Sequence, residues 1–171
     1  MKTLFLASLL LLSGCASLQT QVEIKAPANA VRAVLYDFRD YPKWNPFITK
    51  VDGDVAEGNR IDVTVMPPGG TELESGADVT SVTPNHLAWE GSGRPKEVIG
   101  PFSMNIPGVL KASYDFTIEE VGPGRTIFRN NVDISGASAG SYDLKPLEAG
   151  MDAMNEALKK RAEDLVGTHA R

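Results

Sequence analysis

The chain ends in a long amphipathic helix, and the rest of the molecule must supply an apolar surface to cover it. Residues 144–166 are predicted to be helical because their apolar side chains recur every three or four residues. This apolar stripe consists of Leu147, Met151, Met154, Leu158, Ala162 and Leu165. The opposite side of the helix carries the charged residues 159–161, 163 and 164. Such a helix is stable in a domain only when its stripe packs against another layer.

A series of alternating segments before this helix predicts that the other layer is a β-sheet. Residues 21–26 place Val22, Ile24 and Ala26 on one face and polar side chains on the other, which is typical of a half-buried strand. Six more strands are predicted at residues 47–55 (with a bulge at Asp52–Gly53), 60–66, 71–82, 86–90, 110–118 and 125–134. A helix at residues 28–38 separates the first strand from the others. This order favours an α+β fold.

The composition is that of a single globular domain. A chain of 171 residues with 42% hydrophobic and 23% charged residues can form one sizeable core. Its formal net charge of -5 argues against a nucleic-acid partner and against electrostatic attachment to anionic lipid. The single cysteine excludes a disulfide within the chain, so stability must come from packing.

The single cysteine, Cys15, directly follows a short apolar N-terminal run. Lys2 supplies a positive start, and residues 4–12 are apolar apart from Ser8. This run is shorter than the about 20 residues that span a bilayer, so it is predicted to be an export signal. The small residues Ser13–Gly14 before Cys15 resemble the lipobox of bacterial lipoproteins. That resemblance implies cleavage before Cys15, diacylglycerol on its thiol and acylation of the new N-terminus. The alternative is an ordinary secretory signal.

The lipobox resemblance divides the chain into a signal peptide at residues 1–14, a short tether at 15–19 and a domain at 20–171. It implies a membrane partner through lipidated Cys15 and a place in the cell envelope. Because Ala16 rather than aspartate follows Cys15, the lipoprotein sorting rule implies the periplasmic side of the outer membrane where the host has two membranes. At about 3.3–3.6 Å per extended residue, the tether keeps the domain within about 15 Å of its anchor.

The order of elements and several short motifs resemble the START-like or SRPBCC superfamily, the polyketide cyclase/dehydrase and lipid transport group. The resemblance covers residues 22–164. The matching motifs are Ile24–Lys25–Ala26–Pro27 followed by Val31, Asp37–Phe38, Tyr41–Pro42–Lys43–Trp44–Asn45–Pro46–Phe47, Gly124–Arg125–Thr126, Gly150–Met151, Met154–Asn155 and Leu158–Lys159. The resemblance implies a helix-grip fold, in which a curved antiparallel sheet of about seven strands surrounds the long C-terminal helix. It also implies an apolar cavity between sheet and helix.

Inward-facing aromatic residues and methionines are the candidate ligand-binding residues of that cavity. They are Trp44, Phe47, Trp89, Tyr114, Phe116, Phe128, Met151 and Met154. Methionine suits an adaptable binding surface, and an inward Tyr114 hydroxyl would need a polar partner. Tyr114 falls where many members of the superfamily carry a histidine. The alternative for each residue is that it simply fills the core.

Two further segments leave alternatives open. The long apolar loop at residues 91–108 could cover a pocket, contact lipid or fold back on the core. Asn130 and Asn131 are consecutive on the last strand, so one of them must face inward. An inward asparagine could orient a ligand head group, or it could be solvated at a bulge.

Catalytic and cofactor motifs are not found in the sequence. The two histidines, His86 and His169, lie in no metal-ligand pattern, and neither a phosphate-binding glycine loop nor a nucleophile elbow is present. No metal, cofactor or catalytic residue is therefore predicted. Three hypotheses follow: a non-enzymatic lipoprotein that binds a hydrophobic or lipid-like molecule, a cyclase- or hydrolase-like enzyme for an apolar substrate, and an envelope interaction module with a filled core.

Overall fold

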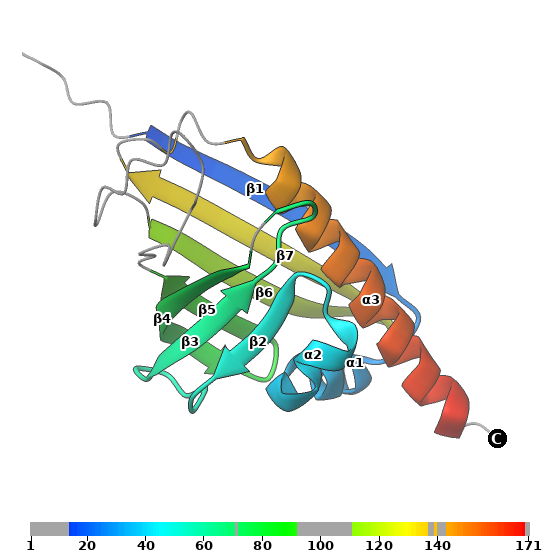
Figure 1. Cartoon of the computed structure of the whole chain (residues 1–171). Helices are drawn as coiled ribbons and strands as arrows, with labels where there is room; N and C mark the ends of the chain where they lie inside the picture. Colours follow the sequence, from blue (N-terminus) through cyan, green and yellow to red (C-terminus); the bar gives the residue numbers. More distant parts are fainter. Residues whose placement is uncertain (1–13, 71, 92–110, 137–138, 140–142, 170–171) are drawn as a thin grey trace, which may run out of the picture.

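Seven antiparallel strands form one sheet that curls around the C-terminal helix (Figure 1). The computed structural model describes residues 14–70, 72–91, 111–136, 139 and 143–169. The strands are β1 (Gly14–Ile24), β2 (Ile48–Asp52), β3 (Arg60–Val65), β4 (Leu73–Thr83), β5 (His86–Gly91), β6 (Lys111–Gly122) and β7 (Arg125–Gly136). Their order in the sheet is β1-β7-β6-β5-β4-β3-β2, so all neighbours except β1 and β7 are consecutive along the chain. The predicted α+β helix-grip fold is confirmed.

The helices lie on one side of this sheet (Figure 1). They are α1 (Ala28–Leu35), the 3-10 turn η1 (Phe38–Asp40), α2 (Tyr41–Trp44) and α3 (Lys145–His169). α3 packs mainly against β1 and α1. Its predicted stripe is buried from Leu147 to Ala162, whereas Leu165 is 38% exposed because the last turns of α3 extend beyond the sheet. Among the described helices, none combines the length and apolarity that a bilayer crossing requires.

The first strand begins earlier than predicted. β1 pairs with β7 along its whole length, from Gly14 opposite Gly136 to Ile24 opposite Thr126. Residues 15–19, expected to form a tether, are therefore part of the sheet. Their side chains already alternate, with Ala16 and Leu18 packed against the core and Cys15 exposed on the outer face.

Two local predictions near the N-terminal helix were wrong. The helix expected at residues 28–38 ends at Leu35, where its buried stripe ends, and the chain continues as η1 and α2. The bulge expected at Asp52–Gly53 lies instead between Ile48 and Lys50. Gly53 follows the end of β2 with a φ of 112°, so this glycine serves the turn rather than the strand.

Candidate functional site

One row of inward-facing residues that runs across the sheet consists mostly of alanine and glycine, whose side chains are small. Successive partners across β1, β7, β6, β5 and β4 in this row are Ala16, Ile134, Ala112, Gly91 and Ala77. The next inward row is larger and consists of Leu18, Val132, Tyr114, Trp89 and Val79. The small row leaves space between the sheet and the first turns of α3, whereas the side chains of the next row are large enough to fill it.

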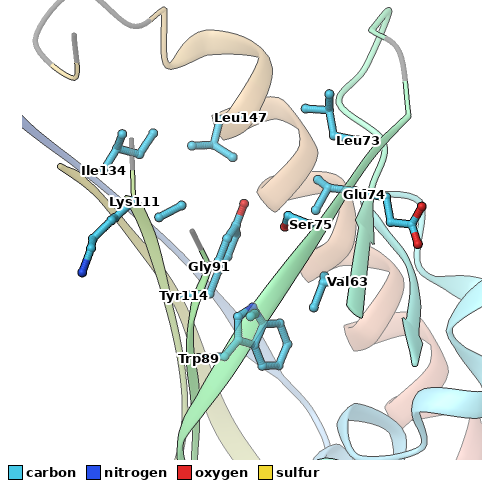
Figure 2. Close-up of a pocket in the computed structure, with 13 residues that line it drawn as sticks. Val63, Leu73, Glu74, Ser75, Trp89, Gly91, Lys111, Tyr114, Ile134 and Leu147 are labelled. Carbon is cyan, nitrogen blue, oxygen red and sulfur yellow. The ribbon is translucent and has the colours of Figure 1, made fainter. Parts of the chain in front are cut away.

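A cavity of about 170 Å³ occupies this space (Figure 2). It lies between the first turns of α3 and the part of the sheet formed by β3 to β7. Its lining comprises Val63, Val65, Leu73, Glu74, Ser75, Ala77, Trp89, Gly91, Lys111, Ala112, Tyr114, Ile134 and Leu147. Apart from Gly91, the loop predicted at residues 91–108 lies outside the described residues.

The cavity is apolar at its inner end, and at its rim stand two charged residues whose charged groups point away from it (Figure 2). Trp89 closes the inner end, being 1% exposed and packed on Phe116 at a ring-centroid distance of 5.0 Å. Tyr114 lies beside Trp89 at 6.2 Å, and Figure 2 shows its hydroxyl directed toward Leu147. Lys111 and Glu74 stand at the opposite end, where β6 and β4 begin. This mainly apolar lining suits an apolar molecule.

Lys111 is held as a cation at this rim. Its Nζ donates a hydrogen bond to Glu90 Oε1 at 2.7 Å. This bond, together with the attraction of the Glu90 charge, raises the pKa of Lys111 above its ordinary value. Lys111 and Glu90 alternate with the inward residues Ala112 and Gly91, so this ion pair lies on the outer face of the sheet and its charges point away from the cavity (Figure 2).

Only two of the eight predicted ligand-binding residues, Trp89 and Tyr114, line this cavity. The other six are Trp44, Phe47, Phe116, Phe128, Met151 and Met154. Trp44 packs on Tyr41 with ring centroids 5.1 Å apart, and the remaining five are at most 1% exposed in the core. The apolar cavity expected between helix and sheet is therefore found at one end of that space, and these six residues lie outside its lining.

The small residues that create the cavity were missed. Ala77, Gly91 and Ala112 carry no chemical signal of their own, and an alternating pattern shows only that they face inward. What distinguishes them is that they are partners in adjacent strands. Knowledge of the strand register would have identified these three residues. An alternating pattern alone does not provide the register.

The two asparagines of β7 lie elsewhere. Asn130 faces inward and is fully buried, so the expectation of a solvated bulge does not hold for it. Its Nδ2 lies 3.9 Å from Met154 Sδ, and its Oδ1 has no hydrogen-bond donor among the described residues. Asn131 faces outward, and its Nδ2 lies 3.5 Å from Asp115 Oδ1. Neither side chain lines the cavity.

A polar cluster forms on the outer face of the sheet. The His86 ring lies between Ser81 Oγ, 2.9 Å from Nδ1, and Asp115 Oδ2, 2.5 Å from Nε2. A register shift between Val79 and Ser81 places the serine on this face. The sheet separates these three residues from the cavity, so they cannot act on a molecule bound there. In the described part of the chain, no three His, Cys, Asp or Glu side chains are arranged to hold a metal ion.

The sequence over residues 16–163 matches the family described as polyketide cyclase / dehydrase and lipid transport. The chain belongs to this family. The predicted START-like resemblance is thereby confirmed, and membership in the polyketide cyclase/dehydrase and lipid transport family agrees with an apolar ligand cavity. No curated protein sequence matches the chain.

Solved structures show the same fold at low sequence identity. A START superfamily protein from Mycobacterium smegmatis is 20% identical, with a TM-score of 0.63, over 87% of this chain and 98% of that one. The Zhui aromatase/cyclase from Streptomyces sp. R1128 is 18% identical, with a TM-score of 0.63, over 90% and 96%. Truncated norcoclaurine synthase from Thalictrum flavum is 16% identical, with a TM-score of 0.62, over 86% and 93%. At these identities the solved structures establish the fold of the chain. They do not establish an activity.

Proposed function

We propose that the protein is a membrane-anchored lipoprotein that binds a hydrophobic or lipid-like small molecule in the cavity beside α3. The observation that carries the proposal is a space with aromatic and aliphatic walls and the hydroxyls of Ser75 and Tyr114 at its edge. Apolar surface leaves water favourably, and a few polar groups at the edge of a pocket orient the bound molecule. The proposed role is binding rather than catalysis.

The size of the cavity limits the guest. A cavity of about 170 Å³ is close to the engineered apolar cavities of about 150 Å³ that take up benzene. The guest, or the part of it that is buried, is thus about the size of one aromatic ring or a short segment of an acyl chain.

The membrane attachment is proposed to run through lipidated Cys15. Cys15 is exposed, and the family match begins at the next residue. More than one acyl chain is needed for stable anchoring, which the lipobox chemistry would provide. The place proposed for the protein is the cell envelope, on the periplasmic side of the outer membrane where the host has two membranes.

The binding proposal is tested by filling the cavity. Ala112→Phe places a ring in the space, whereas Ser113→Phe places the same ring on the outer face of the same strand. We expect brominated stearic acid to quench Trp89 fluorescence in the natural protein and in Ser113→Phe, but not in Ala112→Phe. Gly91→Leu is a second filling variant, because a Cβ at Gly91 meets no atom closer than 3.7 Å. Quenching that survives both filling variants would place the guest elsewhere.

The anchor is tested separately by mass spectrometry of the mature N-terminus and by incorporation of labelled palmitate. We expect label in the natural chain and none in Cys15→Ser, which should also leave the membrane fraction. An unmodified Cys15 in membrane-bound protein would contradict the anchor.

A second candidate function is catalysis on an apolar substrate, and one observation favours it. The hydroxyls of Ser75 and Tyr114 belong to residues that line the same cavity. Two of the similar structures carry the names aromatase/cyclase and norcoclaurine synthase. If the bound molecule recovered from the protein is chemically changed on incubation, and Tyr114→Phe stops the change but not the binding, the enzymatic function replaces the binding function.

A further inference from the structure

The proposed anchor and the cavity lie at the same end of the sheet. Cys15 on β1 is the partner of Ser135 on β7, which is the partner of Lys111 on β6. Lys111 stands at the rim of the cavity. Two strand spacings of about 4.8 Å therefore separate the Cys15 and Lys111 backbones by about 10 Å. The next residue, Ala16, is the partner of Ile134, which lines the cavity.

No flexible chain separates the anchor from the domain. β1 is paired with β7 from Gly14 onward, and its inward side chains Thr20, Val22 and Ile24 are buried. Cleavage before Cys15 would leave the anchored residue as the first residue of the paired strand. The acyl chains would thus hold the sheet by its own edge, and the domain could not turn freely above the membrane.

The cavity is oriented toward that same end. Trp89 forms its closed inner end. On β5 this residue comes two positions before Gly91, which places it further from the start of β1. The lining residues at the other end, Leu73 and Lys111, are the first residues of β4 and β6 and lie nearer to the start of β1. α1 and α2, with Trp44, lie toward the opposite end of the sheet (Figure 1).

We infer that the rim of the cavity faces the lipid leaflet that holds the anchor, and that the guest is exchanged directly with this leaflet. The inference rests on the proposed function, since it takes the lipidated Cys15 and the apolar guest as given. An apolar molecule passing from the leaflet into the cavity keeps little apolar surface in water on the way. The guest class is then a molecule dissolved in that leaflet, such as a fatty acid, rather than one delivered through the aqueous phase.

The test compares loading with and without a flexible linker at the anchor. About 15 Gly/Ser residues inserted between Cys15 and Ala16 would let the domain move about 20 Å from its anchor while leaving strand pairing from Ala16 intact. The same insertion in the turn at Gly122–Arg125, at the far end of β6 and β7, is the matched control. Both are made in the full-length lipidated chain carrying Trp44→Phe, so that Trp89 is the only tryptophan.

The protein is reconstituted in phosphatidylcholine vesicles, and brominated stearic acid in the membrane serves as the probe. We expect Trp89 to be quenched about tenfold more slowly in the anchor-linker protein than in the parent, because the linker lowers the effective concentration of the rim at the lipid surface. The turn-insertion control should load at the parental rate. Supplying the same fatty acid from water on albumin should remove the difference.

The outcomes separate the inference from the proposed function. Equal loading rates from the membrane for the parent and the anchor-linker protein would overturn the inference while leaving the binding function intact. Absence of quenching in every protein would instead remove the binding function. In a separate chain that carries Trp89→Phe and keeps Trp44, quenching of Trp44 together with no quenching of Trp89 in the Trp44→Phe parent would show that the opposite end of the domain meets the lipid, which also overturns the inference.

Discussion

Phe47 packs into the space that Gly150 leaves on α3. A methyl group at Gly150 would overlap the Phe47 ring, which is 1% exposed and cannot swing away. We expect Gly150→Ala to lower the free energy of unfolding by about 1–2 kcal/mol, because overpacking of about 1–3 kcal/mol outweighs the better helix propensity of alanine. Urea denaturation at neutral pH measures this change.

Gly167 is the matched control for that substitution. It lies on the same helix, and a Cβ there would meet no atom within 4 Å. Gly167→Ala should therefore stabilise the protein by about 0.5–1 kcal/mol. Equal effects at the two positions would show that the Phe47 contact does not limit the residue at 150.

A buried polar pair joins α3 to β1. Asn155 Nδ2 donates to Thr20 Oγ1 at 2.8 Å, and the two residues are 2% and 7% exposed. Thr20→Val keeps the shape but removes the acceptor, so we expect a loss of about 1–3 kcal/mol in the free energy of unfolding. Thr20→Val combined with Asn155→Leu should recover much of that loss, as a double-mutant cycle would measure. An additive double variant would show that the pair does not interact.

At the scale of elements, an ion-pair cluster connects α3 to the short helices. Asp40 on η1 accepts from Lys43 Nζ at 2.7 Å and from Arg161 Nη2 at 2.5 Å. The hydrogen bond from Lys43 is the main cause that lowers the pKa of Asp40. The positive charges of Lys43 and Arg161 lower it further. The stabilising contribution of the Asp40 carboxylate is therefore present above the ordinary aspartate pKa of about 3.9 and disappears as pH falls through the lowered value.

The corresponding variant is Asp40→Asn. We expect it to be less stable than the natural protein at pH 7, and the difference to vanish in acid once Asp40 is protonated. Urea denaturation across that pH range measures both. A difference that persisted unchanged at low pH would mean that the effect of the substitution is steric rather than electrostatic.

On the scale of the whole molecule, binding in the cavity should be visible as stability. A ligand at about 100 times its Kd stabilises the folded state by about 2.7 kcal/mol, which corresponds to a rise in Tm of about 5–10 °C for a domain of this size. We expect decanoate to raise the Tm of the natural protein and of Ser113→Phe, but not that of Ala112→Phe. Equal shifts in all three would indicate a site outside the cavity.

The alternating strands and the amphipathic helix were sufficient to predict an α+β fold, and the resemblance carried by motifs such as residues 41–47 implied the helix-grip arrangement. These patterns report which face of each element is apolar, and an apolar face of a sheet and an apolar stripe of a helix can be buried together in few ways. The bounds of β3, β5 and β7 and the buried stripe from Leu147 to Ala162 agree with the predictions to within two residues.

The position of the cavity was decided only by the tertiary structure. By itself the sequence determined that Trp89, Phe116 and Met154 are inward-facing, but an inward side chain can line a space or fill it. Which of these occurs depends on what lies beside it in strands and helices that are distant along the chain. Ala77, Gly91 and Ala112 become neighbours only through the strand register, and empty space arises from the sum of small volumes in one row rather than from the chemistry of any one residue.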